Sequence, residues 1–148
     1  MDKAVSKTSA EADIQALTES WQQAASAGDL AAIMSHYAPD VVAFDAIAAL
    51  QFKGIDQYRK HWQACLAMCS GPMTFKLHEL NIVASDDIAY SHALNRCGGT
   101  DKNGEEHASW MRVTTGYRKS NGAWHIVHEH FSAPFDMENC KALLDLQP

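Results

Sequence analysis

Hydrophobic residues in the N-terminal half of the chain recur at helical spacing. The first predicted helix carries Ile14, Leu17 and Trp21 along one face and ends at Gly28, a residue type that often follows a helix. A short second helix is expected because an aspartate can cap its start and a proline blocks its continuation. The predicted helices cover residues 8–28, 30–37 and 55–69.

Runs with strand character follow the helices. Asn121-Gly122 between two alternating runs is a strong hairpin signal, so we expect the last four strands to form an antiparallel meander. Residues 137–146 are expected to form a short helix or a tail. The predicted strands cover residues 41–47, 73–84, 88–97, 108–117 and 124–135.

This order of elements predicts an α+β fold in which the helices cover one face of a curved antiparallel sheet. A cavity would form between the sheet and the helices. The length of 148 residues fits one domain, residues 1–148, with residues 1–8 as a frayed N-terminus.

The last predicted strand is unusual because ionisable residues occur on both of its faces. Alternation places His128 and His130 with Ile126 on one face, and Glu129 with Phe131 on the other. A strand that is partly buried on both faces and still carries such groups is a candidate pocket wall. Burial of one face in a dimer is the competing explanation.

Composition narrows the class of partner. The chain is 47% hydrophobic, and no apolar run reaches the roughly 18 residues that a membrane helix needs. A net charge of −6 argues against binding nucleic acid or an anionic membrane through a positive field, which leaves a small molecule or a protein. Residues 1–10 lack the apolar stretch of a secretory signal, so we expect a cytoplasmic protein.

The four cysteines show no zinc-binding pattern of the Cys-x₂-Cys kind. Cys65 and Cys69 are four residues apart on a predicted helix, whereas Cys97 and Cys140 fall in other elements. We expect reduced thiols that pack as small apolar residues, and no cofactor.

Five motifs occur in a set order along the chain, namely Ala27-Gly28-Asp29-Leu30, Tyr37-Ala-Pro-Asp-Val-Val42, Phe52-Lys-Gly-Ile-Asp-Gln-Tyr58, Gly122-Ala-Trp124 and His128-Glu-His-Phe-Ser-Ala-Pro134. Taken in this order, they resemble the nuclear transport factor 2-like superfamily, and within it the SnoaL-like and ketosteroid-isomerase-like proteins. The closing motif is also similar to the association domain of calcium/calmodulin-dependent protein kinase II. The resemblance implies a cone-shaped α+β barrel with a ligand pocket, often paired as a homodimer through the outer face of its sheet.

Asp45 resembles the general base of the ketosteroid isomerases. Apolar neighbours would raise the pKa of its carboxyl towards the range useful for moving a proton beside a carbonyl. The isomerase also needs oxyanion donors, but Trp21 stands where its tyrosine would be, and residues 112–115 where its aspartate would be. This departure argues against authentic steroid isomerisation. Backbone capping at a strand end is the alternative role for Asp45.

Arg112 shares a strand face with Trp110 and Thr114. If that face points into the cone, Arg112 either pairs with Asp45 or Glu129 or holds an anionic ligand.

His92 shares a face with Tyr90 and Leu94, where it either meets Asp45 or Arg112 across the pocket or is a hydrogen-bonded core residue.

The His128-x-His130 pair could bind a metal if a third ligand came from a neighbour, such as His92 or His107. We expect hydrogen bonding at the end of the sheet instead, and no metal. The resemblance implies that Val127, Glu129 and Phe131 point inwards, although a bulge would change this, and it makes Glu129 a second candidate acid or base.

We therefore expect a small-molecule pocket with isomerase-like or hydrolyase-like acid–base chemistry on a carbonyl or polyketide-like compound. Asp45 would accept the proton, with His92, Arg112 and Glu129 orienting the substrate or supplying charge. The alternative is a non-catalytic ligand-binding or oligomerisation module of the same fold. Aromatic and polar candidates for contact with the ligand are Trp21, Tyr37, Phe44, Tyr58, Trp62, Trp110, Thr114, His130 and Phe131.

Overall fold

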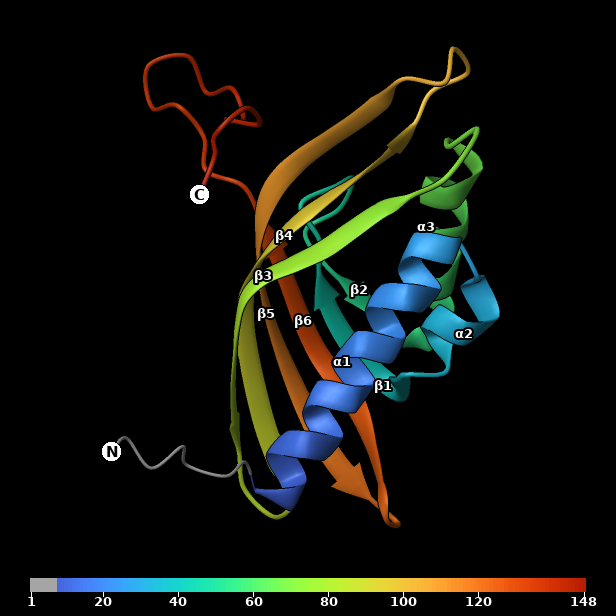
Figure 1. The fold of residues 1–148 in the computed structure, drawn as a ribbon, viewed down its shortest axis with the longest axis vertical. Helices are drawn as coiled ribbons and strands as arrows, with labels where there is room; N and C mark the ends of the chain where they lie inside the picture. The colour runs from blue at the N-terminus through green and yellow to red at the C-terminus, as the bar shows by residue number, and fades with distance from the viewer. Residues whose placement is uncertain (1–7) are drawn as a thin grey trace, which may run out of the picture.

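The computed structural model describes residues 8–148 (Figure 1). Of the predicted frayed segment, residues 1–7 lie outside the described part of the chain. The described helices are α1 (Ser9–Ala27), α2 (Leu30–Met34) and α3 (Ile55–Ala67). The described strands are β1 (Tyr37–Phe44), β2 (Phe52–Lys53), β3 (Thr74–Ala84), β4 (Ile88–Thr100), β5 (Glu106–Ser120) and β6 (Ala123–Ser132).

Helix α1 has the termini that its sequence predicts. The Thr8 side chain accepts a hydrogen bond from the backbone N–H of Glu11, and Gly28 ends the helix with a φ of 65°. Its apolar face, with Ile14 and Trp21 buried, packs across the concave side of the sheet (Figure 1). None of the helices within residues 8–148 is both long and apolar enough to cross a membrane.

The second predicted helix is too long, and the first predicted strand starts too late. Helix α2 ends at Met34, and Tyr37 already begins β1. The reason is tertiary: Tyr37 pairs with Ile126 of β6, whose N–H donates to the carbonyl of His36 at 2.8 Å. Pro39, which has no N–H, falls where the register between β1 and β6 shifts.

The strands form one sheet in the order β2-β1-β6-β5-β4-β3. Strands β3 to β6 make the predicted antiparallel meander, and the hairpin at Asn121-Gly122 is confirmed, with positive φ at both residues. Strand β1 runs parallel to β6. The α+β class and the curved sheet wrapped around helices are confirmed, although the sheet is not closed (Figure 1).

Two glycines just beyond the predicted end of a strand at residue 97 lie within the sheet. Strand β4 continues through Gly98 and Gly99 to Thr100, and β5 begins at Glu106. A Cβ at Gly98 would lie 1.8 Å from the carbonyl oxygen of His107, and one at Gly99 would lie 2.4 Å from Cys69 Sγ. These glycines therefore serve close packing rather than a change of direction.

The C-terminal segment is a tail and not a helix. After β6 it turns back on itself through a single bridge between Phe135 and Ala142. It extends away from the sheet and from α1 (Figure 1).

Candidate functional site

A bulge in the last strand decides which of its side chains face the helices. The register between β5 and β6 shifts between Gly116 and Tyr117. Ile126 and Glu129, three residues apart, are therefore both buried against the helices. Strict alternation would have placed them on opposite faces.

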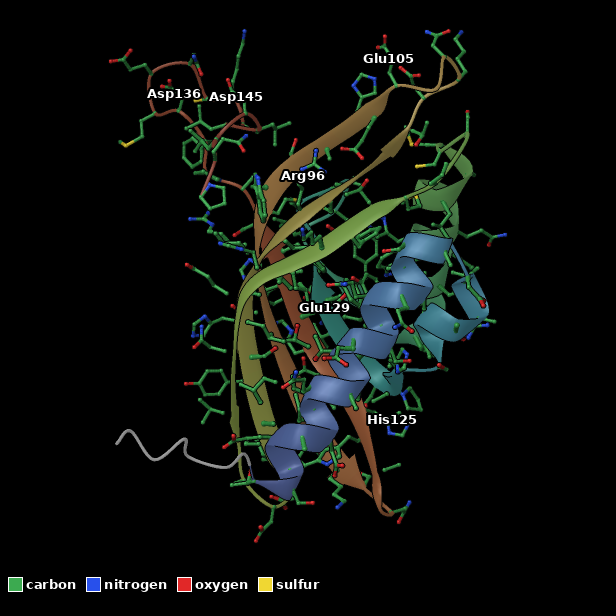
Figure 2. All side chains as sticks on the ribbon, viewed as in Figure 1. Arg96, Glu105, His125, Glu129, Asp136 and Asp145 are labelled. Carbon is green, nitrogen blue, oxygen red and sulfur yellow. The ribbon has the colours of Figure 1, made fainter. Side chains whose placement is uncertain are left out.

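Glu129 is the most deeply buried ionisable carboxyl of the described chain, with 1% of its surface exposed. It lies between the sheet and α1 (Figure 2). Its Oε1 accepts hydrogen bonds from the hydroxyls of Tyr37, at 2.7 Å, and Tyr58. Trp21 Nε1 in turn donates to the Tyr37 hydroxyl at 2.8 Å. Four of the predicted site residues thus form one hydrogen-bonded group.

Burial raises the pKa of Glu129 to about 7, and the negative charge of Asp45 acts in the same direction. The two tyrosine hydroxyls oppose this increase because they donate to the carboxylate. Glu129 can therefore exchange a proton near neutral pH, as an acid or base must.

Asp45 follows β1 and is held by a residue that we did not single out from the sequence. Its Oδ2 lies 2.5 Å from Nε2 of His61 on α3, and its Oδ1 accepts from the N–H of Ala46 at 2.7 Å. The His61 ring stacks on Phe52 with a centroid separation of 4.2 Å. An ionised carboxylate can only accept, so Nε2 carries the proton in this pair.

One sequence signal could have found His61. Tyr58, His61, Trp62 and Cys65 follow helical i, i+3, i+4, i+7 spacing, so the imidazole lies on the apolar face of α3. A titratable ring at such a position needs a partner, and Asp45 supplies it.

Cys65 beside His61 is not set up as a nucleophile. Its Sγ lies 3.8 Å from Nε2 and 4.0 Å from Nδ1, so it is not aligned with either nitrogen alone. Burial raises the pKa of the Cys65 thiol, and the charges of Asp45 and Cys69 add to this effect. All four cysteines are free, as predicted.

Six predicted site residues lie on the opposite face of the sheet. Arg112 is exposed, and its Nε donates to Ser132 Oγ at 3.1 Å. The predicted pairing of Arg112 with Asp45 or Glu129 is therefore wrong, and so is the expected approach of His92 to Asp45. Sequence alternation grouped these residues correctly but did not show which group faces the helices. Exposed on this face are His92, Arg112, Thr114 and His130, with Phe44 and Trp110 half-buried.

The predicted hydrogen bond at the end of the sheet is present. His128 Nδ1 donates to the carbonyl of Val42 at 2.6 Å. Within residues 8–148, a different group has its potential ligand atoms close together, namely Asp101, Glu105 and His107 in the β4–β5 turn. Asp101 is already bonded there to His107 Nε2 and to two backbone N–H groups.

A small cavity of about 20 Å³ remains between α1 and the sheet. This volume holds about one water molecule. Glu129 lines it, together with Ser91 and Thr18, whose hydroxyls both hydrogen-bond to the Tyr117 hydroxyl at 2.9 and 3.1 Å. At this position, between α1 and the sheet, side chains leave little more than the space of one water molecule.

Asn95 on β4 is fully buried, and neither its Nδ2 nor its Oδ1 has a hydrogen-bond partner among the described residues. Trp62 Nε1 is buried and unpartnered as well. A buried polar group without a partner costs about 1–3 kcal/mol. The interior therefore contains polar side-chain atoms that have no hydrogen-bond partner among the described residues.

Comparison with known proteins supports the fold. A crystal structure of a nuclear transport factor 2-like protein of unknown function from Pseudomonas putida is 50% identical, with a TM-score of 0.86 over 93% of this chain and 96% of that one. A provisionally described dehydratase of the same family from Streptomyces avermitilis is 15% identical, with a TM-score of 0.71 over 82% and 94%. The association domain of calcium/calmodulin-dependent protein kinase II from C. elegans is 21% identical, with a TM-score of 0.66 over 82% and 93%.

The curated proteins gave no match. The family model for the SnoaL-like domain matches residues 14–136, which include every element from β1 to β6. The chain therefore belongs to the SnoaL-like domain family, within the nuclear transport factor 2-like fold.

Proposed function

We propose that this chain binds a small carbonyl or polyketide-like compound between the sheet and the helices and moves a proton beside its carbonyl group. The observation that carries this proposal is the pairing of Asp45 with His61 at 2.5 Å on the inner side of the sheet. A carboxylate held in one orientation by a buried donor is suited to accept a proton from carbon.

Asp45 is the proton acceptor, and His61 is the residue that positions it. Glu129 is the partner acid, because its raised pKa lets it carry a proton near neutral pH. In an isomerisation the proton returns to another carbon. In a hydrolyase reaction the proton on Asp45 comes from the α carbon, a β-hydroxyl leaves as water with a proton from Glu129, and a carbon–carbon double bond forms.

A substrate larger than water needs more space than the 20 Å³ cavity. The side chains that fill the cone are mainly aromatic, including Trp21 stacked on Phe131 and edge-on to Trp62 and Phe75. Ligand binding would therefore displace tryptophan rings, and a change in tryptophan fluorescence on adding a ligand would report it.

The test measures exchange of α protons for deuterium in cyclohexanone dissolved in D₂O, followed by NMR. The wild-type protein should speed up exchange, and Asp45→Asn should lose about 10²- to 10⁴-fold of that acceleration. The matched control is Asp40→Asn, an exposed aspartate on β1, the strand that Asp45 follows, and it should exchange at the wild-type rate. Wild-type binding of cyclohexanone without any exchange would instead support a non-catalytic ligand-binding module.

We also propose that the chain forms a homodimer in the cytoplasm through the outer face of the sheet. Val83, Ile88 and Tyr90 on β3 and β4 are about half exposed there, at 52%, 58% and 49%. The four free thiols support a reducing location. Sedimentation should give a dimer for the wild-type chain and a monomer for Tyr90→Glu, whereas an assembly larger than two would favour an oligomerisation module.

A further inference from the structure

Asn95 differs from the other polar side chains on the inner face of β4. Ser91, four residues earlier on the same face, is equally buried, but its hydroxyl is bonded to Tyr117 at 2.9 Å. Both side-chain atoms of Asn95 lack partners among the described residues.

The surroundings of Asn95 do not favour a buried water as its partner. Its neighbours along β4 are Ala93 and Cys97, and across the sheet it is paired with Leu77 and Met111. An ordered buried water needs two to four polar partners, and these four side chains supply no strong one. The side chains next to the amide within the sheet therefore offer it no strong hydrogen-bond partner.

Asn95 faces the same interior as the proposed acid–base residues. Ala93 and Leu77, its neighbours, line the cavity together with Glu129. Burial raises the pKa of Cys97, two residues from Asn95, to about 11, and the charge of Asp45 adds to the effect. Trp62 on α3, whose Nε1 is also buried without a partner among the described residues, packs on Phe75, which is paired with Cys97.

We propose that Asn95 is the specificity-determining residue for a ligand that carries a carbonyl oxygen next to a hydroxyl group, the β-hydroxycarbonyl class. Asn95 Nδ2 donates to the carbonyl oxygen, and Oδ1 accepts from the hydroxyl. An amide offers one donor and one acceptor side by side, so it matches such a pair better than an isolated ketone. The substrate class rests on the proposed function, but binding at Asn95 does not depend on catalysis.

The probe is diacetone alcohol, a β-hydroxyketone, and its methyl ether is the matched ligand that lacks the hydroxyl donor. The side-chain amide signal of Asn95 in the NMR spectrum of nitrogen-labelled protein, identified by its loss in Asn95→Leu, should shift with diacetone alcohol. The ether should bind about tenfold more weakly. An unmoved amide signal at saturating diacetone alcohol, or equal binding of the two probes, would overturn the proposal.

The midpoint of thermal unfolding distinguishes a role of Asn95 in ligand recognition from a structural role. Asn95→Leu should raise the midpoint of thermal unfolding, because it removes an unsatisfied buried amide. It should also weaken binding of diacetone alcohol about tenfold, because the proposed hydrogen bonds to the ligand are lost. Ser91→Ala, the matched control, should lower the midpoint, since it breaks a satisfied bond. A lower midpoint for Asn95→Leu, or a crystal structure with an ordered water bridging Asn95 to protein groups, would assign Asn95 a structural role instead.

Asp45→Asn keeps this test independent of the proposed function. The variant should bind diacetone alcohol as the wild type does while losing α-proton exchange. Exchange that survives Asp45→Asn would refute the acid–base assignment and leave recognition by Asn95 intact. Loss of the preference for diacetone alcohol over its ether in Asn95→Leu is the expected signature of a residue that sets specificity.

Discussion

The two faces of the sheet carry similar polar residue types in opposite roles. On the inner face Glu129 is buried and bonded to two tyrosines. On the outer face Arg112 and His92 are exposed, and Arg112 bonds to a neighbouring serine. The difference teaches that ionisable residues on a strand become chemically unusual only where helices remove them from water.

The two faces should differ most in the free energy of unfolding that is lost when a phenylalanine ring is removed from each. Phe131 is buried on the inner face and stacks on Trp21 at a centroid distance of 6.3 Å. Phe131→Ala should lower the free energy of unfolding by about 3–5 kcal/mol, through lost burial and the space left behind. Phe44 is half-buried on the outer face beside His128, so Phe44→Ala should cost about 1 kcal/mol.

Urea unfolding of both variants at one pH measures the two costs. Equal losses would mean that the outer face is as well packed as the inner face. In that case the outer face could not be the face of the sheet that is exposed to solvent.

The pH dependence of stability should distinguish the buried carboxyl of Glu129 from exposed carboxyls. The pKa of Glu129 rises from 4.5 to about 7 on folding, so the folded state holds a proton that the unfolded state releases. The contribution of this proton to stability is complete below pH 4.5 and is lost as pH rises through 7. The total is about 3 kcal/mol, at about 1.4 kcal/mol for each pKa unit.

Glu129→Gln should remove this fall in stability between pH 4.5 and 7, because glutamine does not titrate. Glu138→Gln, an exposed residue of the C-terminal tail, is the control and should keep the wild-type slope. Unfolding by urea at several pH values gives the slopes. If the slope survives Glu129→Gln, the titrating group lies elsewhere.

The sequence predicted the order of elements well because helical and alternating periods are local properties. The capped α1, the meander and the Asn121-Gly122 hairpin all follow from short-range signals. Errors came where long-range pairing prevailed. Tyr37 was assigned to a helix but pairs with β6, and Gly98 was placed beyond the end of a strand but lies where strands pack closely.

The candidate site was harder to predict because it depends on which face meets the helices. The bulge in β6 brings Ile126 and Glu129 to the same side, and no residue type in the sequence fixes where a bulge falls. His61 lies at a helical spacing that the sequence shows, but its partner Asp45 became clear only when the fold placed that residue next to α3. Asn95 likewise shows its unsatisfied amide only in three dimensions.

The smallest expected effects belong to the outer face. Arg112→Ala and His92→Ala should each change the free energy of unfolding by no more than about 0.5 kcal/mol, since both side chains are exposed. Both should also leave α-proton exchange in cyclohexanone at the wild-type rate. The variants keep their inner walls, so a loss of exchange in Arg112→Ala could not come from Asp45, His61 or Glu129. Such a loss would move the chemistry to the solvent side of the sheet, where Arg112 could bind an anionic substrate.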